Sequence, residues 1–203
     1  MTGVAGDPGW LVVSVSTAGA PDSLRVQVWR KLRSLGALYL HQAVCLLPAR
    51  ERPVREVHRL ADRIRRAGGT VRVLPMRFSD EQAEADVIAE FNSARDAEYA
   101  EVLERIPALR QELAQERARG RFTYAEVEES EADLDRFRRW LEKISERDYF
   151  GAPGRAAAQA AVEEAGAELA AFEAAAFRAA SEPGRPPEAG TGQLSVVRPE
   201  EPA

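Results

Sequence analysis

The sequence predicts an α+β fold in which a small unit of strands and helices is followed by helices alone. Up to residue 78, short β-branched runs alternate with two segments of helical periodicity. Beyond residue 78, the apolar patterns have the three-to-four-residue spacing of amphipathic helices. We therefore expect four parts: a flexible leader over 1–9, an α+β domain over 10–78, a helical domain over 79–180 and a disordered tail over 181–203.

The first strand is predicted over 10–15, where Trp-Leu-Val-Val-Ser-Val forms a short, largely β-branched apolar run. Residues 20–23 then offer N-cap positions for a helix, and Gly36 ends it. The apolar side chains of this helix recur at helical spacing: Leu24, Val28, Leu32 and Leu35. We expect that face to be buried.

The next segments complete a small sheet. Two extended stretches, 37–41 and 43–47, are close enough to form either a hairpin or one bent strand. Pro53 suits the first turn of a second helix, which the glycines at 68–69 close, and 70–74 is the fourth strand. The order β-α-β-β-α-β is that of the ferredoxin-like unit, in which two helices cover one face of an antiparallel sheet.

The following segment is predicted to be helical from a capping box formed by Ser79 and Gln82. Its amphipathic pattern runs to about residue 106. Pro107 should then either kink this helix or begin a new one that ends at Gly120.

Two more helices are expected after Gly120. A second capping box, Thr123 with Glu126, opens a helix that continues to 149–150. The stretch at 151–154 breaks it, and an alanine-rich helix follows over 155–180. The remainder, rich in proline, glycine and glutamate, predicts disorder.

The net charge of -5 conceals an uneven distribution. Residues 1–78 contain 13 basic and 5 acidic side chains, whereas residues 79–203 contain 15 basic and 28 acidic ones. A basic half attracts phosphate or another oxyanion, or it docks on the acidic half of the same chain. No long apolar run and no signal-peptide pattern occur, so we expect a cytoplasmic protein without a membrane partner.

The first helix holds one set of candidate binding residues. Arg25, Trp29 and Arg33 share a face, with Arg30 and Lys31 beside them. Such a stripe suits phosphate groups or an oxyanion through charge-assisted hydrogen bonds. The alternative is a solvated basic face in which Trp29 covers the junction to the helical part.

Two further sets of arginines extend this hypothesis. Arg55, Arg59 and Arg63 make the second helix the densest positive surface of the chain, and nucleic acid is the obvious class of partner for it. The helical part also places arginines beside a tryptophan, Trp140. Many carboxylates lie nearby in the sequence, and they pair with some of the positive charge of these arginines. The candidates there are Arg138, Arg139 and Arg147.

The sequence contains little that indicates a metal site or a catalytic site. One cysteine and two histidines do not make a cluster at ligand spacing, and Cys45 reads as a buried small apolar residue. The sequence has no nucleophile elbow, no glycine-rich phosphate loop and no neighbouring Cys/His pair. We therefore expect no enzyme activity, no cofactor and no metal.

Short sequence motifs in a fixed order resemble those of ChrB-type chromate resistance proteins. They cover roughly residues 10–178, and the first part also resembles the ferredoxin-like middle domain of PaaX-type repressors. The motifs lie at 10–15, 28–32, 35–37, 42–48, 68–69, 122–129, 138–140 and 147–151.

The resemblance implies a chromate-responsive regulator, or an accessory protein, of an operon for chromate efflux. Its expected partners are promoter DNA and chromate or a sulfate-like oxyanion. An alternative is a helical interaction module that pairs with itself or with a separate C-terminal chromate-resistance domain, since longer members carry such a domain. A third interpretation is a chromate reductase, although no cofactor site or redox cysteine pair is visible.

Overall fold

The fold is described from a computed structural model, which covers residues 9–119 and 124–181. The leader up to residue 8, the expected helix end at Gly120, the expected cap at Thr123 and the tail from residue 182 lie outside these residues. Among the described helices, none is long and apolar enough to cross a membrane.

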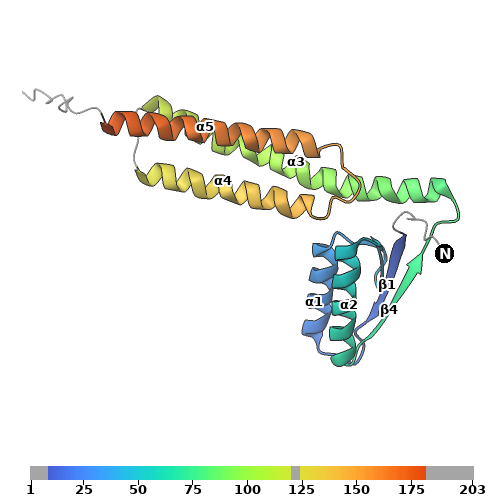
Figure 1. The fold of residues 1–203 in the computed structure, drawn as a ribbon. Helices are drawn as coiled ribbons and strands as arrows, with labels where there is room; N and C mark the ends of the chain where they lie inside the picture. The colour runs from blue at the N-terminus through green and yellow to red at the C-terminus, as the bar shows by residue number, and fades with distance from the viewer. Residues whose placement is uncertain (1–8, 120–123, 182–203) are drawn as a thin grey trace, which may run out of the picture.

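The first part of the chain is the predicted βαββαβ unit. Its four strands form one antiparallel sheet in the order β2-β3-β1-β4, and its two helices lie side by side on one face of that sheet (Figure 1). Because β2 and β3 pair with each other, the extended segments form a hairpin and not one bent strand. The elements are β1 (Trp10–Ser16), α1 (Asp22–Ser34), β2 (Leu38–His41), β3 (Val44–Pro48), α2 (Glu51–Arg66) and β4 (Thr70–Met76).

Strand β1 is apolar on both faces because both are covered. Leu11 and Val13 point into the core under α1 and α2, where Cys45 and Leu47 of β3 join them. Trp10 belongs to a separate cluster on the opposite face. The continuous apolar run at the start of the sequence thus reflects a central strand between two cores.

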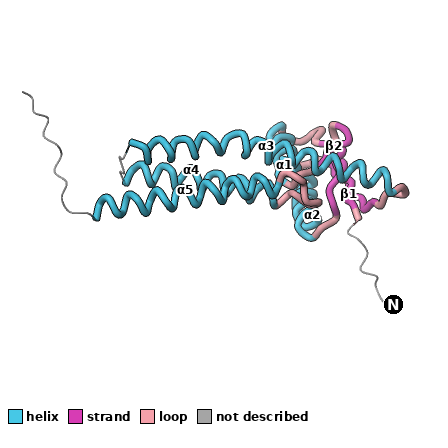
Figure 2. The backbone as a smooth tube through the Cα atoms, turned by 90° about the horizontal axis from the view of Figure 1, so that it is seen from above, coloured by secondary structure: helices cyan, strands magenta, loops and turns pink. Residues whose placement is uncertain are grey.

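The second part is a bundle of three helices that run alongside one another (Figures 1 and 2). These are α3 (Glu81–Arg119), α4 (Tyr124–Ser145) and α5 (Arg155–Ser181). Helix α3 is 39 residues long, and its first turns extend past the bundle to the sheet-bearing part (Figure 1). One helix therefore belongs to both parts.

Pro107 lies inside α3 and does not start a new helix, so that alternative is wrong. A proline in a helix removes one main-chain hydrogen bond, and packing can outweigh this cost. The neighbours Ile106 and Leu109 are buried in the bundle core, at 2% and 5% exposure. Burial of residues on both sides of the proline thus accompanies a helix that continues through it.

Two predicted helix ends also need correction. Helix α3 starts at Glu81, and the Asp80 carboxylate accepts the Gln82 N–H at 3.0 Å, so Asp80 replaces Ser79 as the cap. Helix α4 ends at Ser145, before the expected 149–150. The Asp148 carboxylate binds the main-chain N–H groups that follow it, which favours a loop there.

The alanine-rich helix α5 packs closely against its two neighbours. Ala158 and Ala165 are fully buried, and their small side chains let the helix axes approach. Leu169 and Phe172 supply most of the apolar bulk on the same face. This contact explains how a helix with few large side chains joins the core.

Candidate functional site

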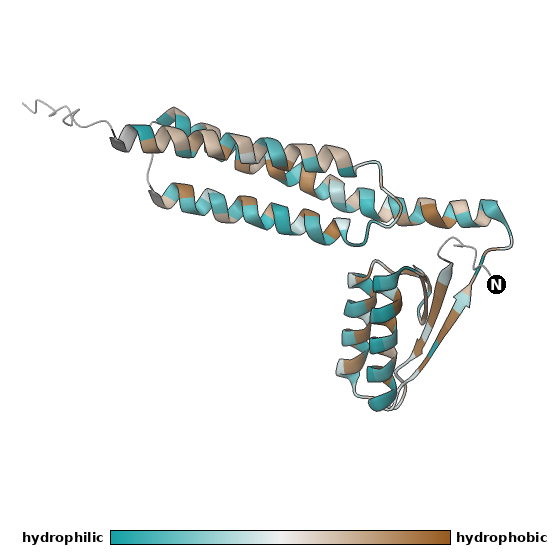
Figure 3. Cartoon of the chain, in the orientation of Figure 1, coloured by the Kyte–Doolittle hydropathy of each residue, from teal (hydrophilic) through white to brown (hydrophobic). Residues whose placement is uncertain are grey.

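The candidate arginines of α1 and α2 are exposed because the apolar faces of both helices are turned to the sheet. Leu24, Val28 and Leu32 of α1 are buried, as are Val57 and Leu60 of α2. Many of the other residues of α1 and α2 are hydrophilic (Figure 3). The surface is therefore predominantly polar and basic.

Glu56 neutralises part of this basic surface. Its carboxylate lies 2.6 Å from Lys31 Nζ of α1 and 2.9 Å from Arg59 Nη1 of α2. The hydrogen bond from Lys31 is the main cause that lowers the pKa of Glu56. Lys31 and Arg59 thus connect the two helices and contribute less free positive charge than the sequence implied.

Other candidates keep their charge available. Within the described ranges, Arg25, Arg30 and Arg63 have no hydrogen bond or ion pair, and Arg55 has only an exposed contact of 3.3 Å with Glu51. Unpaired guanidiniums on adjacent helices are the arrangement that attracts phosphate or another anion.

A cleft of about 420 Å³ opens beside α1, towards β2 and β3. Arg25 and Trp29 line it, and Trp29 is 46% exposed. The Arg33 guanidinium lies over the Trp29 ring, 5.1 Å from its centroid. The stripe predicted from the sequence therefore has a hollow beside it, while Arg30 does not line the cleft.

The second group of arginines lies elsewhere and is largely paired. Arg138 contacts the Asp135 carboxylate at 3.3 Å, and Arg139 Nε donates to the Asp135 carbonyl at 3.1 Å. Trp140 packs against Phe137 within the bundle, and the Arg105 guanidinium lies over its ring. Within the described residues, no hydrogen bond or ion pair connects this group with α1 or α2.

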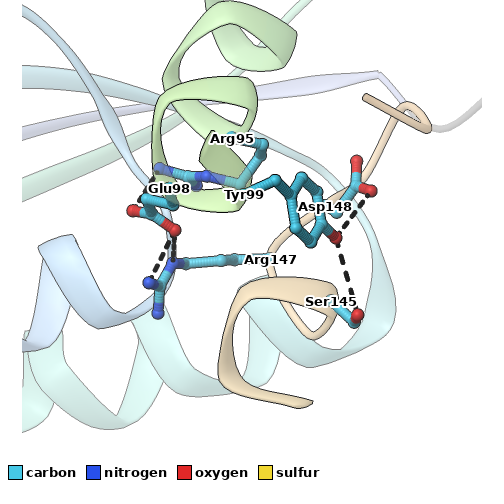
Figure 4. Close-up of polar contacts among 6 residues, drawn as sticks. All are labelled: Arg95, Glu98, Tyr99, Ser145, Arg147 and Asp148. Atoms are coloured by element: carbon cyan, nitrogen blue, oxygen red, sulfur yellow. Dashed lines mark hydrogen bonds and ion pairs between the residues drawn. The ribbon is translucent and has the colours of Figure 1, made fainter. Parts of the chain in front are cut away.

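Arg147 belongs to a partly buried cluster of charged side chains beside Gly36, where the two parts of the fold meet (Figure 4). Its guanidinium donates to Glu98 Oε2 of α3 at 2.7 Å and 3.2 Å, and Glu98 Oε1 also accepts from Arg95 at 3.1 Å. Burial lowers the pKa of Arg95, whose side chain is 9% exposed. This geometry gives Arg147 a structural position and not a free surface.

The residues that follow Arg147 connect the two parts of the fold. Asp148 accepts hydrogen bonds from the Tyr99 hydroxyl at 3.1 Å and from the N–H groups of Gly151 and Ala152. The Tyr149 hydroxyl donates to the Leu35 carbonyl at the end of α1. The 147–151 motif is thus a connector between helix bundle and sheet.

Trp10, and not Trp29, covers the junction between the two parts. The Trp10 ring stacks on Phe150 at 5.5 Å between centroids and also contacts Phe91 of α3. Its indole N–H donates to Glu84 at 2.6 Å. The sequence contained a signal for this role, because a bulky aromatic residue began a largely apolar strand.

Comparison with known proteins places most of the chain in one family. The family model described as "Protein ChrB, N-terminal" matches residues 25–183. The curated "Protein ChrB" of Cupriavidus metallidurans is 28% identical over 158 residues, which cover 76% of this chain and 44% of that protein. The chain therefore spans less than half the length of this relative. No solved structure matches. Because the match extends from α1 through the whole helical bundle, the chain belongs to the family of ChrB N-terminal domains.

Proposed function

We propose that this chain is a cytoplasmic, non-enzymatic protein of chromate resistance that regulates, or assists the regulation of, an operon for chromate efflux. In this proposal it binds promoter DNA or chromate through the α1–α2 surface. The observation that carries it is the set of exposed arginines on two adjacent helices, of which Arg25, Arg30 and Arg63 have no partner among the described residues. Membership of the ChrB N-terminal family supports the connection with chromate.

Phosphate groups suit this surface better than they suit the bundle. On the bundle, carboxylates are within reach of the candidate arginines, as Asp135 is of Arg138. On the helix pair, Glu56 is shared by Lys31 and Arg59, which leaves the pair a net positive cluster. Each phosphate bound there would release counterions, so binding should weaken steeply with salt.

A gel-shift titration with the promoter DNA of the chain's own operon tests the proposal, with and without chromate and over a series of salt concentrations. We expect salt-sensitive binding that chromate changes. Replacing Arg30 and Arg63 together by glutamine should lower the salt slope by about one unit for each phosphate that the variant no longer neutralises. Arg138→Gln is the matched control, because Arg138 is exposed but paired with Asp135.

The absence of a shift in both conditions would remove DNA binding from the proposal. Equilibrium dialysis with chromate would then test whether the chain binds chromate directly. If dialysis also detected no binding to the full chain, the α1–α2 surface would have neither function.

A second candidate function is an interaction module that pairs with itself or with a separate C-terminal domain. The observation in its favour is the bundle of α3, α4 and α5, which extends away from the sheet-bearing part and offers a long helical surface for such a contact (Figure 1). Light scattering should then give a dimer or a hetero-complex that survives charge reversal at Arg59 and Arg63. A monomer at micromolar concentration that captures no C-terminal domain would refute it.

A further inference from the structure

The cleft beside α1 has a composition that suits a bare oxyanion poorly. Arg25 is the one cationic side chain among its lining residues, and it lies at an exposed position of α1. Val28, Leu32 and Cys45 contribute buried apolar walls. A tetrahedral dianion loses its hydration on entering such a site and finds one guanidinium in return, which is insufficient compensation.

The same composition suits an anion with an apolar body. Trp29 lines the cleft and exposes 46% of its surface, so its indole offers contact area for a planar group. Arg33 lies over the Trp29 ring and orients it. Gln42 and Thr17 add polar groups to the lining. The volume of about 420 Å³ lies within the range of roughly 300–1,000 Å³ that is typical of small-molecule sites.

We propose that this cleft binds a small aromatic monoanion, with its ring against Trp29 and the apolar walls and its acidic group on Arg25. The ligand class is set by the pairing of one unpartnered guanidinium with a half-exposed indole over an apolar interior. Arg25 belongs to both this cleft and the α1–α2 surface, whereas Arg30 and Arg63 lie outside the cleft, so probe binding to the cleft can be measured separately from DNA binding to those two arginines.

Cys45 takes no covalent part in this site. Burial raises the pKa of the Cys45 thiol to about 12, which keeps it protonated at neutral pH. A protonated, 1% exposed thiol behaves as a small apolar group. Cys45 therefore forms part of the apolar wall of the cleft and does not act as a nucleophile.

Fluorescence titration of the full chain with 8-anilinonaphthalene-1-sulfonate tests the proposal, because this probe joins an aromatic body to one anionic group. We expect saturation at one probe for each chain and energy transfer from tryptophan. Arg25→Gln should weaken binding by about tenfold, which corresponds to one charge-assisted hydrogen bond. Arg30→Gln, on the same helix but outside the cleft, should bind as the unchanged chain does.

Two further measurements distinguish this site from nonspecific binding. Trp29→Leu should remove most of the energy transfer and weaken binding, whereas Trp140→Leu should leave the affinity unchanged. The uncharged analogue N-phenyl-1-naphthylamine should bind the unchanged chain more weakly than the sulfonate probe does. Its affinity for Arg25→Gln should equal its affinity for the unchanged chain. Equal affinity of the sulfonate probe for the Arg25 and Arg30 variants would overturn the proposal, as would its full displacement by millimolar sulfate.

These outcomes are independent of the DNA experiment. Loss of probe binding in Arg25→Gln with no gel shift in any protein would support the cleft and refute the proposed DNA contact. A normal gel shift, together with equal probe binding by Arg25→Gln and Arg30→Gln, would support the proposed DNA contact and refute the cleft site. Thermal unfolding of each variant checks that it is folded, and substitutions at the exposed Arg25 and Arg30 should leave the melting temperature nearly unchanged.

Discussion

The Tyr149 hydroxyl donates a 2.7 Å hydrogen bond to the main-chain carbonyl of Leu35, 114 residues earlier in the chain. Leu35 is the C-cap of α1, where carbonyl groups have no partner within the helix. The loop after α4 therefore supplies part of the cap of a helix in the sheet-bearing unit. The Arg50 guanidinium donates to the Tyr149 carbonyl, which holds the same loop from the α2 side.

Replacing Tyr149 by phenylalanine should lower the free energy of unfolding by about 1–2 kcal/mol, because the Leu35 carbonyl loses its partner in a partly buried place. Urea unfolding at pH 7 measures the change. Tyr39→Phe is the control, since within the described residues the Tyr39 hydroxyl makes no hydrogen bond. Equal stability of the two variants would show that the Tyr149 bond contributes nothing.

Gly36→Ala should be much more costly than Gly19→Ala. Both glycines have a positive φ, +70° and +82°, so both variants incur the strain of the left-handed region. A Cβ on Gly36 would also lie 2.7 Å from Arg95 Nη1 and 2.9 Å from Arg147 Cβ, whereas one on Gly19 meets nothing within 4 Å. We expect a loss of about 1 kcal/mol for Gly19→Ala and at least about 2 kcal/mol more for Gly36→Ala.

Thermal and urea unfolding of both glycine variants give this difference. The difference between the two variants measures the cost of the close contact at Gly36, because the backbone strain is common to both variants. If the two variants lost the same stability, the junction would not be tightly packed at Gly36.

Glu98→Gln should destabilise the protein by about 2–3 kcal/mol, because it leaves the guanidiniums of Arg95 and Arg147 without their shared carboxylate. Their side chains are 9% and 19% exposed, so water replaces the missing partner poorly. Glu101→Gln is the matched control on the same helix, since Glu101 reaches an exposed Arg105 at 3.8 Å. That variant should change stability by less than about 0.5 kcal/mol in the same urea titration.

The pair formed by Glu56 with Lys31 should contribute to stability at neutral pH and not at low pH. The folded state lowers the pKa of Glu56 below its usual 4.5. Its contribution is thus complete above pH 4.5 and disappears as the pH falls through the lowered value.

Glu56→Gln should consequently be less stable than the unchanged chain at pH 7, by no more than about 1 kcal/mol. The difference should shrink as the pH falls below 4.5 and passes through the lowered pKa of Glu56. Urea unfolding at several pH values gives the two curves, with Glu51→Gln as the exposed control. A difference that stayed constant over this range would contradict the role of the Glu56 charge.

The order of strands and helices could be predicted because each element has a local cause. Alternating apolar faces, the break at Gly36 and the glycines at 68–69 all act within a few residues, so their effect is visible in the sequence. Pro107 marks the limit of this reasoning. Its local effect favours a helix end, but burial of its neighbours on α3 outweighs that effect.

The candidate binding residues were predictable as a group, but their separation was not. Arg25 and Trp29 line the cleft and Arg33 lies over the Trp29 ring, as their spacing of four residues implied. Arg147 resembles them in sequence and yet is paired with Glu98, 49 residues away, in a partly buried position. No local pattern distinguishes an exposed arginine from one that pairs across such a distance.

The sequence by itself determined the α+β fold, the unequal charge of its two halves and the family motifs, because these depend on residue type and short spacing. Only the tertiary structure decided the roles of the aromatic residues. Trp10 covers the junction and Trp29 faces solvent at a cleft, although both are tryptophans in predicted elements of the same unit. The physical reason is that α3 covers one end of the second sheet face, and whether a side chain meets that helix depends on contacts between segments more than 70 residues apart.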